Sequence, residues 1–171
     1  MAVREIVLLG DPVLRQKSKK IHRVDDAAKQ LVQDLADTVK ATPNGAGLSA
    51  PQIGIPLRAI VTYVDDKLKI LINPEVVEES EDVEEAMEGC LSIPGWYGPV
   101  QRPLRVTVRG LSKSGRPTKF KSEGLEARCF LHEIDHLNGV LFIDRLTDRS
   151  RLQKVDSEEE EEELEEEQVF A

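Results

Sequence analysis

The sequence has only two cysteines, Cys90 and Cys129, in 171 residues. Two thiols are too few for the disulfide framework of a small secreted protein, so we expect both to be reduced. No stretch approaches the ~20 apolar residues that a membrane helix needs. The apolar run within residues 1–10 is too short for a secretory signal, and the turn-forming pair Asp11-Pro12 follows it. These absences predict a cytoplasmic protein without a membrane partner.

No internal repeat and no Gly/Ser-rich linker divides the chain. With 40% hydrophobic residues, a chain of this length can build one core. The net charge of −9 is concentrated at one end, since residues 158–167 hold nine glutamates. Without them, the remaining 23 acidic residues equal the 23 basic ones. We expect one domain over residues 1–156 and an acidic tail over residues 157–171.

The tail carries like charges at a density that opposes burial, so we expect a flexible or helical extension. Its simplest role is to keep the chain soluble. The alternative is that Leu164, Val169 and Phe170 contact a basic partner. In neither case do we expect the tail to bind nucleic acid directly, because phosphates repel glutamates.

An amphipathic helix is predicted to begin at Asp25 and to end near the Pro/Gly-containing segment 41–45. Apolar residues recur there at the spacing i, i+3, i+4, i+7, i+8 and i+11, which is one face of a helix. They are Ala28, Leu31, Val32, Leu35, Ala36 and Val39.

The middle of the chain predicts antiparallel strands. Two hairpins are expected, one from residues 58–64 and 68–72, the other from residues 105–109 and 118–121. The acidic strip 75–88 between them is interpreted as a solvated strand and loop edge. A second helix is predicted over residues 123–137, with Ser122 as N-cap and Asn138-Gly139 as its end. This order predicts an α+β domain with mixed, mainly antiparallel strands around a central helix.

The predicted second helix contains the HExxH pattern His132-Glu133-Ile134-Asp135-His136. Four residues advance a helix by ~400°, so both imidazoles face the same side. They can therefore converge on one cation, with Glu133 beside them. The same face continues backwards through Cys129 and Leu125, which form a small apolar wall. An exposed helix could carry this pattern by accident, but the apolar surroundings favour a buried metal site.

A catalytic metal site of this type needs a third protein ligand and an open fourth position. Phe142 stands where a metzincin would have a third histidine, and a thermolysin-like glutamate would have to come from Asp156 or the tail. The remaining candidates are Cys129, only three residues before His132, and Cys90. We favour Cys90.

Three segments resemble, in order, the three motifs of peptide deformylases: GAGLSAPQIG at 45–54, EGCLSIPG at 88–95 and HEIDHLNGVLF at 132–142. The segments DPVLR at 11–15 and Arg102-Pro103 fit as well, so the resemblance reaches from near the start to about Arg145. It implies that one divalent metal ion is held by Cys90, His132 and His136. Fe²⁺ is expected first, while Zn²⁺, Ni²⁺ and Co²⁺ suit the same ligands.

The resemblance also implies the reaction, which is hydrolysis of the N-formyl group of new polypeptides that begin with formyl-methionine, releasing formate. Glu133 would take the proton of the attacking water and pass it to the leaving amine. The side-chain amide of Gln52 and the backbone N–H of Leu91 would stabilise the charge on the formyl oxygen. The expected substrate-binding residues are Gly45, Gly47 and Gly89, which let an extended peptide lie against the backbone, and Leu125 and Cys129, which line a methionine pocket.

The chain departs from the family pattern at a few positions. Leu131 stands where many relatives have glutamine, and Ser49 where many have alanine. Arg128 and Trp96-Tyr97 are expected at the rim of the pocket. The acidic tail is unlike a basic ribosome-docking end, so ribosome association is compatible with the sequence but is not indicated by it.

Two other functions stay open. One is a zinc endopeptidase, which would need room for a peptide on both sides of the metal. The other is an interaction protein with a structural metal site, which would need four protein ligands. A fourth ligand is hard to find, because His22 lies in the basic segment 17–23. We therefore favour an open, catalytic site.

Overall fold

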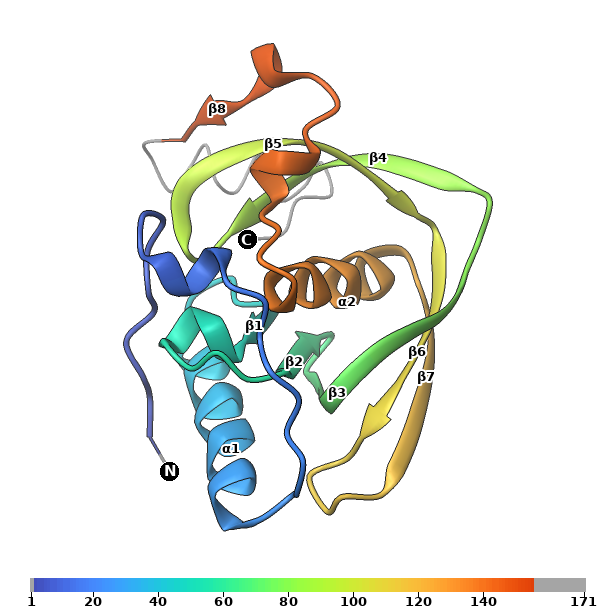
Figure 1. Cartoon of the computed structure of the whole chain (residues 1–171). Coiled ribbons are helices and arrows are strands. Elements are labelled where there is room, and N and C mark those ends of the chain that lie inside the picture. Colours follow the sequence, from blue (N-terminus) through green and yellow to red (C-terminus); the bar gives the residue numbers. More distant parts are fainter. Residues whose placement is uncertain (1, 156–171) are drawn as a thin grey trace.

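Two α-helices, eight strands and four short 3-10 helices make up the part of the chain that the computed structural model describes, residues 2–155 (Figure 1). The tail and the expected boundary at residue 156 lie outside it. The helices and strands are α1 (Asp26–Ala41), β1 (Gly47–Ser49), β2 (Ala59–Val64), β3 (Lys67–Glu79), β4 (Val83–Cys90), β5 (Ile93–Pro103), β6 (Arg105–Leu111), β7 (Pro117–Glu123), α2 (Gly124–Leu137) and β8 (Gln153–Lys154). The 3-10 helices are η1 (Pro12–Arg15), η2 (Ala50–Ile53), η3 (Phe142–Arg145) and η4 (Arg149–Arg151).

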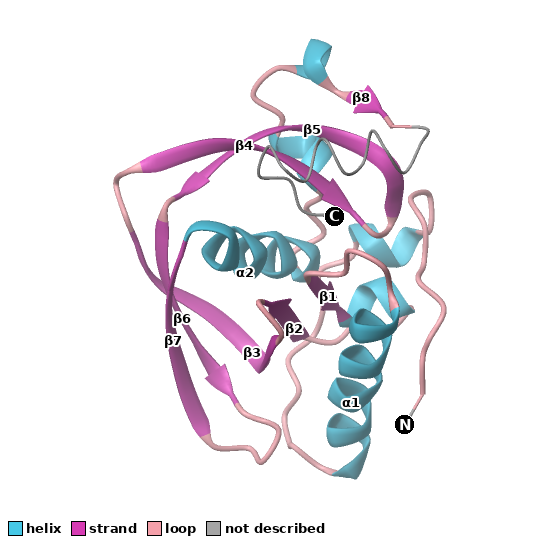
Figure 2. Cartoon of the chain, turned by 180° about the vertical axis from the view of Figure 1, so that it is seen from behind, coloured by secondary structure: helices cyan, strands magenta, loops and turns pink. Residues whose placement is uncertain are grey.

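The strands form two antiparallel sheets, one in the order β1-β2-β3-β6-β7 and one in the order β4-β5-β8. Alternate residues of β2 face opposite sides of the first sheet, so Ala59 and Val61 pack with α1, and Ile60 packs with α2. Helix α2 therefore lies between the first sheet and the ribbon formed by β4 and β5 (Figures 1 and 2). The predicted α+β fold is confirmed.

Helix α1 has the predicted apolar stripe, and the six residues of the stripe are all buried. Asp25 is its N-cap, because the carboxylate accepts a hydrogen bond from the backbone N–H of Ala28 at 2.9 Å. The helix ends at Ala41, close to the predicted stop before Pro43. Its buried stripe supports the face of the first sheet opposite α2.

Both predicted hairpins are present, as β2–β3 and β6–β7. Asp65 and Asp66 both have positive φ, 53° and 58°, which is the backbone of the tight turn that suits twisted strands. The acidic strip is more ordered than predicted. It forms the outer part of β3 and most of β4, and its last glutamate, Glu88, is fully buried.

Ser122 is not the N-cap of α2, as the sequence predicted. The backbone stays extended through Glu123 and turns at Gly124, where φ is +61°, so Ser122 belongs to β7 and its hydroxyl donates to Glu126 instead. The end of the helix is as predicted, with Asn138 as C-cap. Over residues 2–155, neither helix is long and apolar enough to cross a membrane.

Candidate metal centre

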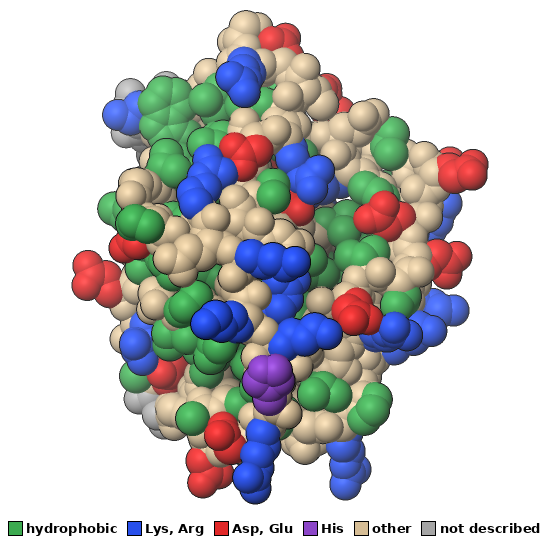
Figure 3. Space-filling model, viewed as in Figure 1, with side chains coloured by type: hydrophobic (Ala, Val, Ile, Leu, Met, Phe, Trp, Pro, Cys, Tyr) green, Lys and Arg blue, Asp and Glu red, His purple; other side chains and the backbone are tan. Residues whose placement is uncertain are grey.

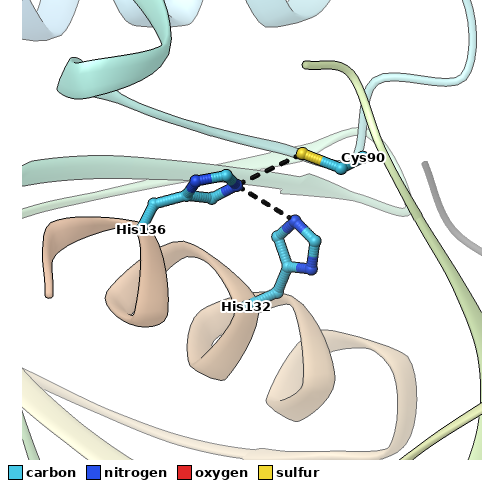
Figure 4. Close-up of side chains that lie close together, drawn as sticks. All are labelled: Cys90, His132 and His136. Atoms are coloured by element: carbon cyan, nitrogen blue, oxygen red, sulfur yellow. Dashed lines mark hydrogen bonds between the residues drawn. The ribbon is translucent and has the colours of Figure 1, made fainter. Parts of the chain in front are cut away.

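Two separate elements bring the three expected ligands together (Figure 4). Cys90 is the last residue of β4, while His132 and His136 stand one turn apart on α2. The Sγ atom of Cys90 lies 3.3 Å from Nε2 of His136, which lies 3.3 Å from Nε2 of His132. All three side chains are buried, with 3%, 3% and 1% of their residue surface exposed. The histidines thus face Cys90 from one side, as the spacing of the HExxH pattern predicts.

The donor set fits one small divalent ion. Ligand atoms that share a tetrahedral ion at ~2.0–2.3 Å lie ~3.3–3.6 Å from one another, close to the spacing found here. Among the residues that the structure describes, no other histidine, cysteine or carboxylate joins this group. Instead, Oε1 of Glu133 lies 3.7 Å from Nε2 of His132, and its Oε2 is buried without a hydrogen-bond partner. The group therefore has three ligands with a carboxylate beside them.

Neither of the two positions considered for other metal-site patterns supplies a ligand. His22 is exposed, whereas His132 and His136 are buried. Figure 3 shows Lys and Arg side chains around a histidine on the surface. Phe142 is buried and stacks on the ring of His132, with 6.4 Å between ring centroids. Neither residue completes a four-ligand structural site.

A buried glutamate orients the first histidine. Oε1 of Glu88 lies 2.8 Å from Nδ1 of His132, and the same carboxylate accepts hydrogen bonds from Arg102 and Arg128. Burial alone raises the pKa of Glu88, but the hydrogen bonds and charge of Arg102 and those of His132 outweigh it and hold the pKa well below its ordinary value. An ionised Glu88 keeps the proton of His132 on Nδ1 and leaves Nε2 free to bind a metal.

The sequence interpretation missed Glu88. One signal was available, because Glu88 precedes Cys90 by two residues, and residues i and i+2 of a strand share a face. The other half of the arrangement was not visible locally. The partners of Glu88 come from β5 and α2, 14 and 40 residues away in the sequence.

A second buried carboxylate extends this network. Asp135 accepts a 2.7 Å hydrogen bond from Arg102 and two from Arg145, at 2.6 and 3.0 Å. Arg102 therefore bridges Glu88 and Asp135.

Burial also changes the titration of the group itself when no cation is bound. It raises the pKa of the Cys90 thiol and of the Glu133 carboxyl, and neighbouring carboxylates add to both shifts. It lowers the pKa of His136, and the neighbouring His132 and Arg102 act in the same direction. The site thus disfavours a thiolate until a cation compensates its charge.

Gln52 faces the same group from the 3-10 helix η2. Its Oε1 accepts hydrogen bonds from the backbone N–H and the hydroxyl of Ser49, each at 3.0 Å. This leaves Nε2 as the inward donor, 3.2 Å from the hydroxyl of Ser92 and 3.6 Å from Sγ of Cys90. Ser49, which departs from the family pattern, therefore adds a donor that fixes the orientation of the amide.

A cavity of about 240 Å³ opens beside Cys90. It is lined by Leu91 and the segment 93–95 on one side and by residues 42–44 on the other. Tyr97 also lines it, as expected for a rim residue, whereas Trp96 is exposed and is not one of the lining residues. Arg128, however, is buried and bound to Glu88, so its expected place at the rim is wrong.

The five expected substrate-binding residues occupy different environments. Gly47 lies where β1 meets α2, so close that an added Cβ would be 2.7 Å from Sγ of Cys129. Cys129 is buried and its thiol donates to the carbonyl of Ala46. Gly45 packs against the end of α1, Gly89 is buried beside Cys90 in β4, and Leu125 is 43% exposed on the first turn of α2.

The sequence is similar to those of known proteins. The sequence model of the family described as polypeptide deformylase matches residues 3–152. A peptide deformylase from Thermomicrobium roseum is 50% identical over 170 residues, covering 94% of this chain and 96% of the relative. One from Carboxydothermus hydrogenoformans is 48% identical over 145 residues, covering 85% and 94%.

Solved structures show the same fold. The crystal structure of a peptide deformylase from Thermotoga maritima superposes with a TM-score of 0.83 at 38% identity, covering 86% of this chain and 100% of that one. A peptide deformylase from Synechococcus elongatus, solved in complex with actinonin, gives a TM-score of 0.82 at 41% identity, covering 98% and 87%. With its motifs, fold and relatives in agreement, the chain belongs to the polypeptide deformylase family.

Proposed function

We propose that Cys90, His132 and His136 hold one divalent metal ion, at which this chain hydrolyses the N-formyl group of formyl-methionine at the start of new polypeptides. Members of the family are metal-dependent hydrolases of this kind and release formate. The observation that supports our residue assignment is the convergence of three buried ligand atoms, with Nε2 of His136 3.3 Å from each of the other two. Because formylated chains are made there, we place the reaction in the cytoplasm.

A divalent ion bound to these residues supplies Lewis-acid chemistry, because it lowers the pKa of water and polarises a carbonyl oxygen. Cysteine and histidine ligands suit Fe²⁺, Zn²⁺, Ni²⁺ and Co²⁺ alike. We propose Fe²⁺ as the ion used in the cell, following the family resemblance of the three motifs.

Glu133 is the proposed general base. Its Oε2 atom is buried without a hydrogen-bond partner, and its Oε1 lies near the histidine ligands. The carboxylate can therefore accept a proton from a water beside the ligand group and pass it to the leaving nitrogen. Burial raises its pKa, and the charge of Glu88 adds to the shift, which brings the group closer to the pH at which it must give the proton back. One carboxylate thus serves both transfers.

Gln52 and Leu91 are the proposed donors to the formyl oxygen. The amide of Gln52 has its oxygen occupied by Ser49 and its nitrogen directed toward Cys90. The backbone N–H of Leu91 directly follows Cys90 at the wall of the cavity. Donors that are fixed before the reaction are worth about 10²-fold or more each, because they need no reorganisation as charge develops.

The edge of the first sheet is the proposed binding place for the peptide. Strand β1 is an edge strand of the first sheet, since it pairs only with β2 there. Its free edge can accept an extended peptide. This supports main-chain pairing at Gly47 and, on the facing side of the site, at Gly89. We assign Gly45 to the same backbone surface, and Leu125 and Cys129 to the pocket of the methionine side chain.

The partner in this proposal is the formylated nascent chain. Contact with the ribosome is compatible with that substrate. A structural metal site is disfavoured, because over residues 2–155 only three ligand groups converge. An endopeptidase is distinguished by its products.

The test is formate release from formyl-Met-Ala-Ser by anaerobically purified protein, with bound metal quantified on the same sample. Glu133→Gln should retain the metal and lose turnover, whereas Cys90→Ser should lose both. If Glu133→Gln loses the metal as well, Glu133 is a ligand and the assigned role is wrong. New internal peptide termini without formate would indicate an endopeptidase.

A further inference from the structure

The buried guanidinium of Arg128 joins the two elements that carry the ligand residues. Arg128 lies on α2, one turn before His132, and only 4% of its surface is exposed. Its NH1 group donates to Oε2 of Glu88 at 2.7 Å and to the backbone carbonyl of Val100 at 2.8 Å. Its NH2 group donates to the backbone carbonyl of Glu84 at 2.7 Å. One side chain of the helix thus binds both strands of the β4–β5 ribbon.

These contacts differ from those of Arg102, the other guanidinium on Glu88. Arg102 connects side chains, namely the carboxylates of Glu88 and Asp135. Arg128 also donates to the main-chain carbonyls of Val100 and Glu84. These carbonyls are part of the strands, so they move only when the strands move. Arg128 therefore fixes how the ribbon sits along α2, and not only the charge of Glu88.

We propose that Arg128 is a positioning residue that sets the register of Cys90 against His132 and His136, and thereby the affinity of the site for its metal ion. Cys90 ends the strand that Arg128 holds at Glu84 and Glu88. A ligand constellation has to be held within ~0.5 Å of its working geometry, so loosening this strand weakens binding. The inference rests on the proposed metal site.

Arginine suits this position for a chemical reason. Three acceptors in two strands surround the side chain, and only a planar fork with five donors can bind all of them at once. A lysine ammonium can pair with Glu88, but its single nitrogen cannot span both carbonyls. A lysine at position 128 therefore keeps the positive charge beside Glu88 but loses the hydrogen bonds that join the two strands to α2.

The experiment measures cobalt(II) binding to metal-free protein, by competition with a chelator and by the thiolate-to-cobalt charge-transfer band, with unfolding temperature recorded in parallel. Arg128→Met should weaken cobalt affinity about tenfold or more, as expected for a group that supports a metal ligand, and should alter the band. Arg128→Lys should show a smaller loss in the same direction.

Lys69→Met is the matched control. Lys69 of β3 pairs with Glu126, also on α2, so it links the same helix to a strand without a proposed ligand. Its loss should lower the unfolding temperature and leave cobalt affinity and spectrum unchanged.

Wild-type affinity and spectrum in Arg128→Met would overturn the proposal and leave Arg128 a merely structural residue. If that variant does not fold, Arg128→Lys decides, since wild-type affinity there overturns the proposal and a several-fold loss supports it. A wild-type protein whose cobalt spectrum lacks the thiolate band, or keeps it in Cys90→Ser, refutes the metal site itself and the inference with it. None of these measurements uses formate release. Failure of the Arg128 proposal can therefore be told apart from failure of the proposed function.

Discussion

At the scale of single residues, Glu88 has the most demanding environment in the site. It is fully buried, and its two oxygens accept hydrogen bonds from Arg102, Arg128 and His132. Removing one partner of a buried ion pair leaves the other charges uncompensated, which costs more than the pair itself contributes. The residue therefore affects the fold and the ligand His132 together.

Glu88→Gln should lower the free energy of unfolding by about 3–5 kcal/mol, because buried Arg128 loses its carboxylate partner and buried Arg102 loses one of its two. Urea denaturation of the metal-free protein measures this. The control is Glu75→Gln, which breaks an exposed pair with Arg109 and should cost about 0–1 kcal/mol. A loss for Glu88→Gln no larger than that of the control would contradict the assigned role.

The pH dependence of stability should carry the signature of Glu88. Its pKa is lowered in the folded protein, so its contribution is complete above the unfolded value of ~4.3 and is lost as the pH falls toward the folded pKa. Unfolding free energies measured from pH 7 down to pH 3 should therefore decline below about pH 4.5. The decline should be shallower in Glu88→Gln. Parallel curves for the two proteins would argue against it.

At the scale of elements, the sequence predicted those helices and turns whose conformation depends on residues close together in the chain. The stripe of α1 and the turn at Asp65-Asp66 are set by periodicity and turn chemistry, and both are present. The β4–β5 ribbon was missed, because the acidic strip reads as solvated until Arg102 and Arg128, distant in the sequence, neutralise Glu88. The ligand group could be predicted because its motifs are short and ordered. The network that supports it could not.

The close approach of β1 to α2 makes Gly47 a test of element packing. An added Cβ there would lie 2.7 Å from Sγ of Cys129 and 3.0 Å from Cγ of Glu133, so Gly47→Ala should cost about 1–3 kcal/mol of stability by overpacking. We also expect a lower kcat at unchanged metal content, because the shift displaces Glu133. Thermal unfolding and metal analysis of the same sample measure both effects.

The double variant Gly47→Ala with Cys129→Ala removes the nearest clashing atom. It should recover part of the stability lost by Gly47→Ala, relative to Cys129→Ala alone. Strict additivity of the two changes would show that the clash is relieved elsewhere.

At the scale of the whole molecule, every proposed site residue lies between Gly45 and His136, well inside the described residues. The Thermotoga maritima structure is matched over its full length by 86% of this chain. We therefore propose that residues 1–156 form the catalytic domain.

Truncation after Asp156 should leave metal content, unfolding temperature and formate release from a short neutral peptide within about twofold of the full chain, as changes remote from a site usually do. Equilibrium dialysis with cobalt(II) and calorimetry check the first two. Loss of metal binding on truncation would show that the domain boundary is misplaced.

The shortness of β1 limits how much of a polypeptide the proposed enzyme can read. An unpaired sheet edge invites aggregation, and a strand of only three residues, Gly47–Ser49, keeps that hazard small. The same three residues span only ~10 Å, enough to template about three residues of an incoming peptide. Residues further along a nascent chain lie beyond this proposed edge. One enzyme that recognises only the first few residues can therefore act on polypeptides whose remaining sequences differ.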